Sequence, residues 1–186
     1  MKFNSKLVKK LYEKYNTDGK ICIPKESRLT YCNSERIRNE LYTLTEELKL
    51  ELHIDFNNCK HKFDVNTLKF VHTLNLTNCQ HVSDVSALKN VHTLNLTSCQ
   101  HVSDVSALKN VHALSLAGCE NVDDVGILKN VNMLNLTYCH TVNNINMLTN
   151  VVTLILNECE NITNIENLNS LQKLEITRCN AIMFIK

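Results

Sequence analysis

Cysteine and histidine are the residues of this sequence that offer the most chemistry, and both recur at a fixed interval. The cysteines in one series follow each other every 20 residues: Cys59, Cys79, Cys99, Cys119, Cys139, Cys159 and Cys179. Two histidine columns share the interval: His61, His81 and His101, and His72, His92 and His112. Thiolates and imidazoles bind metals, and thiolates attack electrophiles or form disulfides. These columns are therefore candidates for metal, redox or nucleophilic chemistry.

The cysteine series nonetheless favours a structural role. Stacked repeats place equivalent Cα atoms about 4.8 Å apart, a separation that disulfides tolerate. The series has an odd number of members, however, and the charged N-terminal segment has no apolar stretch typical of an export signal. Metal sites need ligands that converge, whereas stacked residues run in a line. We therefore expect a ladder of reduced thiols that act as small hydrophobes, with no metal and no cofactor.

The histidine columns have two interpretations. A column of imidazoles can bind zinc or respond to pH near neutrality. Alternatively, the columns follow from duplication alone, since residues 71–90 and 91–110 differ only at Asn78 and Ser98. We favour duplication and place these histidines on the surface beside the strand ends. The sequence also lacks a phosphate-binding loop, a GxSxG motif and an HExxH motif. We predict no catalytic residue and no enzymatic activity.

The elements that must position these columns are repeats of 20 residues. Apolar residues recur at fixed places, which in one repeat are Val71, Leu74, Leu76, Cys79, Val82, Val85 and Leu88. Alternation around residues 74–76 indicates a short strand, and a spacing of three elsewhere indicates a tightly turning segment. One repeat cannot offset the entropy of its own ordering, so neighbours must stack. The period predicts a solenoid over residues 51–186, with about seven repeats and the last truncated.

The pattern LxxLxLxxC resembles the leucine-rich repeat family, with cysteine in a place often held by asparagine. The continuation CxxVSDVxxL is similar to the cysteine-containing subclass, although those repeats run to about 26 residues. The resemblance implies an α/β solenoid, a right-handed superhelix with a parallel β-sheet on its concave face and short helical turns or irregular chain on its convex side. Near-identical, Asn-rich repeats also look like those of giant DNA viruses or amoeboid protists, and a viral source would imply a host partner.

Polar residues at fixed places have structural interpretations. An Asp or Asn precedes each turning segment, where its side chain can cap free backbone N–H groups. This series is Asp64, Asp84, Asp104, Asp124, Asn144 and Asn164. A second series closes the turns, where a residue that tolerates the left-handed conformation is useful. This second series is Asn90, Asn110, Asn130 and Asn150.

Outward-facing residues of the predicted strands make a candidate binding face. Side chains alternate along a strand, so these residues and the one before each cysteine form columns across the sheet. The columns hold only Thr, Asn and Ser over residues 71–110 but diversify later, which indicates either partner binding or neutral drift. Tyr, Arg and Met are favoured in interface cores. The predicted partner-binding residues are Met133, Asn135, Thr137, Tyr138, Thr153, Ile155, Asn157, Glu158, Lys173, Glu175 and Arg178.

The two ends do not follow the repeat. Residues 7–15 and 37–48 show amphipathic helical spacing, and residues 50–56 alternate like a first strand. We therefore expect residues 1–50 to form a mostly helical cap on the first repeat. At the other end, Met183 and Phe184 either cover the last repeat or pair two chains end to end as a homodimer.

An adaptor role is the alternative for residues 1–50. The segment CIPKESRL resembles the start of an F-box, although the pattern that follows differs. Many cysteine-containing repeat proteins carry an F-box and serve as substrate receptors of ubiquitin ligases. The resemblance therefore implies that residues 1–50 recruit such a ligase.

Composition narrows the function further. A net charge of +1 over 186 residues gives no positive field for nucleic acid, and no apolar run approaches the ~20 residues of a membrane helix. The sequence therefore predicts a non-enzymatic, cytoplasmic scaffold that binds another protein on its concave sheet. The alternative is the substrate-recognition subunit of a ubiquitin ligase.

Overall fold

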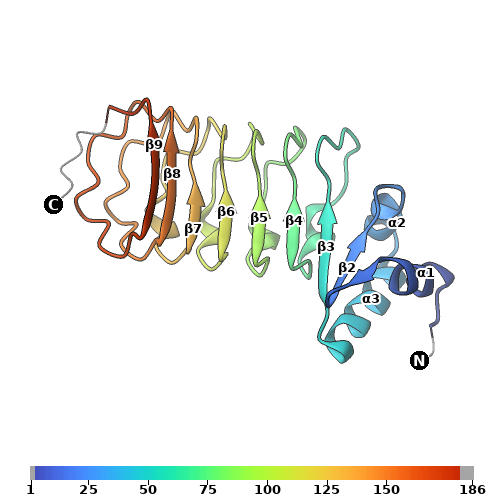
Figure 1. Ribbon diagram of the computed structural model, residues 1–186. Coiled ribbons are helices and arrows are strands. Elements are labelled where there is room, and N and C mark those ends of the chain that lie inside the picture. The colour runs from blue at the N-terminus through green and yellow to red at the C-terminus, as the bar shows by residue number, and fades with distance from the viewer. Residues whose placement is uncertain (1–2, 181–186) are drawn as a thin grey trace.

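The computed structural model describes residues 3–180, which form a helical region followed by a regular stack of strands (Figure 1). The strands make one sheet in sequence order, antiparallel between β1 and β2 and parallel between all later neighbours. The strands are β1 Asn16–Thr17, β2 Lys20–Ile23, β3 Glu51–Asp55, β4 Thr73–Asn75, β5 Thr93–Asn95, β6 Ala113–Ser115, β7 Met133–Asn135, β8 Thr153–Asn157 and β9 Lys173–Thr177. Met183 and Phe184, which were predicted to cover the last repeat or to pair two chains, lie outside the described residues.

Each repeat stacks on the next without a shift in register. Leu74 of β4 lies opposite Leu94 of β5, which lies opposite Leu114 of β6. Every core place predicted for residues 71–88 is buried, and one hydrophobic core runs from Val8 to Leu168. Parallel pairing at a 20-residue interval thus stacks identical side chains on the buried side of the sheet, as the leucine-rich repeat resemblance implied.

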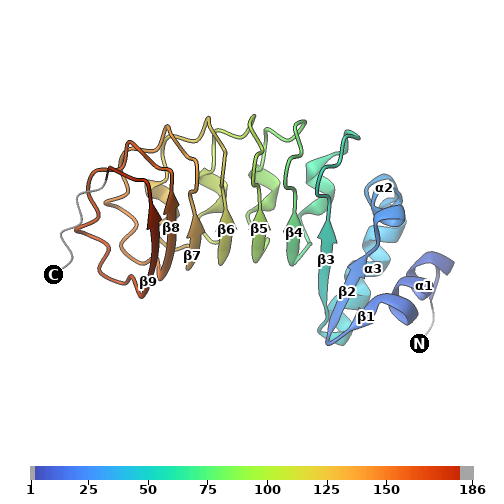
Figure 2. The same cartoon turned by 45° about the horizontal axis from the view of Figure 1, so that its top comes forward.

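Short 3-10 helices occupy most of the turning segments behind the strands (Figure 2). They are η2 Val65–Leu68, η3 Ser86–Leu88, η4 Ser106–Leu108 and η5 Gly126–Leu128. The predicted capping is confirmed, because Asp84 Oδ1 accepts a hydrogen bond from the Ser86 N–H at 2.8 Å. The other members of the series make the same contact two residues further on. These side chains therefore turn the chain back towards the next strand.

The left-handed backbone positions differ from the prediction. Asn90, Asn110, Asn130 and Asn150 do not have positive φ, and the 3-10 helix before Asn90 ends at Lys89 in the right-handed region. Positive φ values of 50 to 68° occur instead at the residue before each cysteine, such as Asn78. There the chain reverses after the strand, so that the Asn78 N–H can reach the carbonyl of Thr97 in the next repeat at 2.8 Å. That hydrogen bond between repeats places the left-handed residue directly before each cysteine.

Residues 3–50 form the mostly helical cap at one end of the sheet (Figure 1). They contain α1 Lys6–Tyr15, the 3-10 turn η1 Lys25–Ser27, α2 Arg28–Asn33 and α3 Glu35–Leu48. Val8, Leu11 and Leu41 bury the amphipathic faces against the core, and Ser34 caps α3 by accepting the Ile37 N–H. None of the helices in residues 3–180 is both long and apolar enough to span a membrane.

The hairpin of β1 and β2 was not predicted. Asp18 and Gly19 both have positive φ and make a tight turn. Ile21 and Ile23 are buried, and β2 pairs in parallel with β3, so the cap extends the sheet by two strands. A four-residue strand without a repeat carries too short a pattern to be recognised from the sequence.

Candidate protein-binding face

Strand register brings the predicted binding residues together on one surface. Met133 lies opposite Thr153, which lies opposite Lys173. The alternating burial of β8 and β9 points these side chains away from the core. Residues 40 apart in sequence therefore lie across three adjacent strands, with about 4.8 Å between neighbouring strands. We call the outward side of β7, β8 and β9, with the residue before each cysteine, the β7–β9 face.

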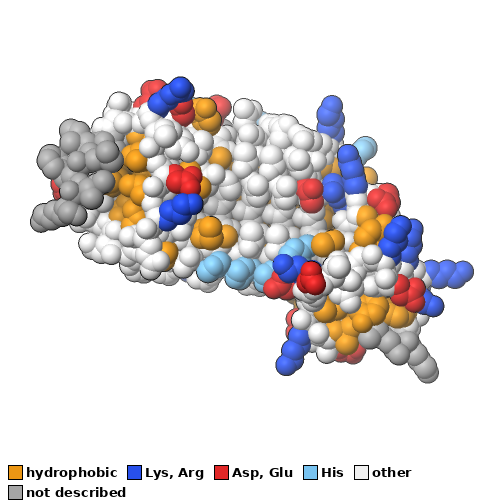
Figure 3. Space-filling model, in the orientation of Figure 1, with side chains coloured by type: hydrophobic (Ala, Val, Ile, Leu, Met, Phe, Trp, Pro, Cys, Tyr) orange, Lys and Arg blue, Asp and Glu red, His pale blue; other side chains and the backbone are white. Residues whose placement is uncertain are grey.

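The β7–β9 face has an apolar part. Met133 is 46% exposed and Tyr138 is 51% exposed, and Ile155, opposite Asn135 on the next strand, is half-buried. Hydrophobic side chains gather towards this end of the array, whereas the middle of the same face is almost wholly polar and uncharged (Figure 3). Among residues 3–180, this end of the face therefore carries the large hydrophobic side chains that are well exposed, Met133 and Tyr138.

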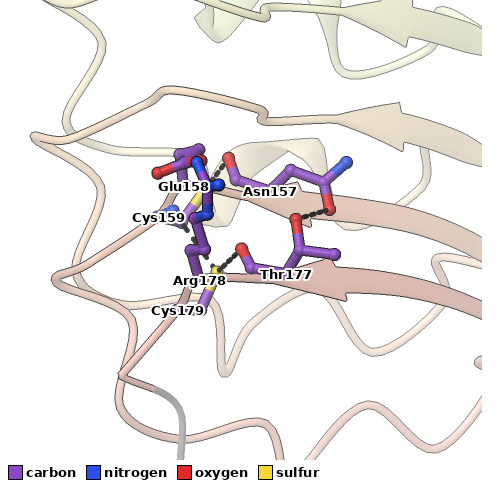
Figure 4. A network of polar contacts seen from close by, with 6 residues as sticks. All are labelled: Asn157, Glu158, Cys159, Thr177, Arg178 and Cys179. Carbon is purple, nitrogen blue, oxygen red and sulfur yellow. Dashed lines mark hydrogen bonds and ion pairs between the residues drawn. The ribbon is translucent and has the colours of Figure 1, made fainter.

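Charged side chains beside this apolar part are paired with each other. Lys173 Nζ lies 2.6 Å from Glu175 Oε1. Arg178 donates to Glu158 Oε1 at 2.6 Å, as Figure 4 shows. The hydrogen bond to Glu158 raises the pKa of the Arg178 guanidinium above its usual value. These charged groups therefore nearly balance each other, and polar groups beside apolar ones are typical of protein interfaces.

Three predicted binding residues have a backbone conformation that disfavours their side chains. Tyr138, Glu158 and Arg178 have φ values of 59, 58 and 50°. The equivalent residues Asn78 and Gly118 are types that tolerate the left-handed region, whereas a bulky residue there costs on the order of 1 kcal/mol. The fold therefore does not explain why tyrosine stands at position 138.

Replacing Tyr138 with Gly is expected to raise the free energy of unfolding by about 1 kcal/mol, because glycine removes the left-handed strain. The matched control is Met133→Gly, which lies within β7 and is expected to destabilise the protein because glycine weakens a strand. Urea unfolding measures both. A destabilised Tyr138→Gly variant would show that side-chain packing, rather than strain, governs this position.

The cysteines of the ladder are free thiols, and the buried ones donate hydrogen bonds to backbone carbonyls of the preceding repeat. Cys99 Sγ donates to the carbonyl of Leu76 at 3.0 Å, and Cys119 Sγ donates to that of Leu96 at 3.1 Å. Burial raises the pKa of the Cys99 thiol to about 11 and that of Cys119 to about 12. Protonated, buried thiols are poor nucleophiles and poor metal ligands. The buried members of the ladder instead act as hydrogen-bond donors that tie adjacent repeats together.

The two histidine columns differ in the structure. His72, His92 and His112 stack with 4.6 Å between neighbouring ring centroids, and His53 lies 5.9 Å from His72. In the other column, His81 packs edge-on against Phe63 instead. Burial lowers the pKa of His72, although Glu51 opposes this effect. Unprotonated rings can stack without charge repulsion.

Glu51 and His53 also lie at the end of the first column, which was not predicted. His53 is paired with Thr73, the residue after His72, so it does not share the 20-residue interval of the histidine column. The interval alone therefore does not identify it. The spacing of Glu51 and His53 by two residues on one predicted strand is the signal that could have found them.

Parallel strands in unshifted register, a stacked leucine core and one short turning segment in each repeat define the fold as a leucine-rich repeat solenoid. No protein-family model and no curated protein matches the chain. Among solved structures, the chain is similar to internalin C2 of Listeria monocytogenes, with 22% identity, a TM-score of 0.38 and coverage of 69% of each chain.

The chain is also similar to the functional domain of InlJ from Listeria monocytogenes, which includes a cysteine ladder. The identity is 15% and the TM-score is 0.48, over 70% of this chain and 35% of that chain. The fold assignment itself depends on the register and the repeat.

Proposed function

We propose that the protein is a non-enzymatic interaction module that binds another protein on the β7–β9 face. The observation that carries this proposal is Tyr138, an exposed aromatic residue at a backbone position that favours Gly or Asn. Because the left-handed backbone disfavours tyrosine there, contact with a partner is a direct reason for its presence. Tyrosine is also among the residue types that contribute most to binding energy.

The surroundings of Tyr138 support the same function. Met133 and Ile155 add apolar side chains to the same face, and the ion pairs Lys173–Glu175 and Glu158–Arg178 lie on it as well. An apolar centre with a polar rim is the usual anatomy of a protein interface. Because the charges are already paired, we expect the partner to present a largely uncharged surface and binding to depend weakly on salt.

Combined substitution of Tyr138, Ile155 and Arg178 with Ala is expected to weaken capture of the partner at least about tenfold, since interface centres carry most of the binding energy. The partner is first identified by cross-linking the full chain in lysate of the source or host cell. Its binding to each variant is then measured with purified proteins.

The matched control for this experiment carries Thr73→Ala, Thr93→Ala and Thr97→Ala on the same sheet but outside the β7–β9 face. We expect the control to bind like the unsubstituted chain. Unchanged binding by the Tyr138, Ile155 and Arg178 variant, with circular dichroism showing a folded protein, would contradict the proposal.

The ubiquitin-ligase role of residues 1–50 stays a prediction, as do the cytoplasmic location and the homodimer. Val8 and Leu41 of the cap belong to the same core as the repeats. The adaptor role is therefore better tested by substituting exposed residues of the cap than by deleting it. Co-purification of a ligase scaffold that such substitutions abolish is the outcome expected of an adaptor.

A further inference from the structure

Three ligand groups converge where the stacked histidine column meets the cap. Glu51 and His53 leave β3 on the same side, and His72 stands beside them because its N–H binds the carbonyl of Leu52 at 2.8 Å. His53 Nε2 lies 2.9 Å from Glu51 Oε2, and His72 Nδ1 lies 3.5 Å from the same oxygen. One ligand atom from each of the three residues lies within 4.8 Å of the others.

We propose that Glu51, His53 and His72 form a zinc-binding site. Two imidazoles and one carboxylate are a ligand set that suits zinc, which usually binds four ligands in a tetrahedron at about 2.0–2.2 Å. Ligand atoms in such a tetrahedron lie about 3.3 Å apart. The separations of 2.9 and 3.5 Å lie on either side of that value. His53 Nε2 is hydrogen-bonded to Glu51, whereas His72 Nδ1 is hydrogen-bonded to Thr73 Oγ1 at 3.3 Å. Zinc binding therefore replaces these two hydrogen bonds and draws together ligand atoms that lie within 4.8 Å of one another.

The site is accessible and held by a rigid backbone. The side chains of His53, Glu51 and His72 are 19, 40 and 34% exposed, so an ion reaches them from solvent. β3 is paired with β2 on one side and β4 on the other, which holds the ligands in place. With three protein ligands, the fourth position remains open to water or to a group from another molecule.

One charged group at the site favours cation binding and another opposes it. The Glu51 carboxylate attracts a cation, whereas Lys20, its neighbour on β2, repels one. Figure 3 shows the histidines as a pale-blue row along the edge of the sheet that ends beside acidic and basic side chains. Substituting Lys20 with Gln is therefore expected to tighten zinc binding.

Stacking explains why the remaining histidines stay outside the site. The rings of His72 and His92 are nearly parallel, with an interplanar angle of 12°. Parallel rings in a row direct their nitrogens side by side and do not surround one point. His112, at the far end of the row, is therefore a matched control that shares the stack and lacks the site.

The test is calorimetric titration of the full, untagged, metal-free chain with zinc chloride. We expect one zinc ion per chain and binding at least about tenfold weaker in each of Glu51→Gln, His53→Gln and His72→Gln, because each removes a ligand. His112→Gln is expected to bind like the unsubstituted chain. Full-strength binding in either His53→Gln or His72→Gln would overturn the proposal.

The experiment must distinguish zinc bound by cysteine thiols from zinc bound by the proposed ligands. Cys22 is exposed and Cys59 is partly exposed, so both are changed to Ser in a background that is expected to keep its zinc affinity. Cobalt binding to that background is expected to give the visible bands of tetrahedral cobalt without an intense near-ultraviolet thiolate band. Loss of zinc binding in the double Ser variant would assign the ion to the cysteines and overturn the site.

Discussion

The protein is expected to unfold as the pH rises from 9 to 11. Burial raises the pKa of the Cys99 and Cys139 thiols to about 11, and that of Cys79, Cys119 and Cys159 to about 12. In the unfolded chain these thiols lose their protons near the ordinary value of about 8.5. The folded chain binds more protons above that value, so its stability falls with rising pH and is fully retained below about pH 8.

The size of this effect follows from the number of thiols. Each contributes about 1.4 kcal/mol per pH unit between its two pKa values. The five thiols with values of about 11 or 12 together give a slope of about 7 kcal/mol per pH unit, against a total stability of about 5–15 kcal/mol for an ordinary domain. Burial raises the pKa of the Cys32 thiol as well, so it acts in the same direction. Tyr31 acts in the same direction at the upper end, because burial also raises its pKa.

Urea unfolding at a series of pH values measures this slope. Cys119→Ala is expected to reduce it by about one sixth, because it removes one of the six buried thiols whose pKa burial raises, even though this variant is less stable at pH 7. The exposed residue Cys22 is the matched control, and Cys22→Ala is expected to leave the slope unchanged. A stability that is the same at pH 8 and pH 11 would contradict the role assigned to the ladder.

The physical reason for this sensitivity is the contact that each thiol makes. Cys139 Sγ donates to the carbonyl of Leu116 at 3.1 Å in a fully buried position. A thiolate there would have no proton to donate and would face the negative end of a carbonyl dipole without water. Ionisation must therefore accompany unfolding.

Replacing Phe56 with Ala is expected to lower the free energy of unfolding by about 3–5 kcal/mol, because a buried aromatic side chain would leave a cavity. Phe56 is fully buried at the place that Leu76 holds in the next repeat. Its ring stacks on Phe63 with 4.3 Å between centroids, and Arg28 of the cap lies over it at 5.9 Å. It thus joins the cap to the array.

Two further variants make this prediction specific. Phe56→Leu restores the residue of the other repeats and is expected to cost less, about 1–1.5 kcal/mol. Leu76→Ala removes a core residue inside the array and is expected to cost about 2–5 kcal/mol without separating the cap. Because solenoid repeats interact with nearest neighbours, Phe56→Ala is also expected to reduce the urea dependence of unfolding. A loss below about 1 kcal/mol would contradict the junction role.

Regular positions were predictable because repetition copies their surroundings. Leu74 and Leu94 occupy the same place in adjacent repeats, and parallel hydrogen bonding stacks equal places, so burial of one implies burial of the other. Asp84 and Asp104 cap their turns for the same reason. The face that carries Met133 and Ile155 followed from simple alternation along the strands.

Positions that depend on contact between repeats, or on the unrepeated cap, were not predictable in this way. The left-handed conformation was expected at Asn90 but occurs at Asn78, because the Asn78 N–H must reach a carbonyl of the following repeat. The β1–β2 hairpin was missed because nothing in the sequence repeats it.

The sequence by itself thus determined the period, the buried core and strand order of the repeats, and the residues of the candidate binding face. Only the tertiary structure decided that Tyr138 has a disfavoured backbone conformation and that Glu51, His53 and His72 converge. The physical reason is that periodicity specifies which side of a strand a residue occupies. The meeting of two side chains from different strands depends on the register of β3 and β4, which backbone hydrogen bonds set in three dimensions.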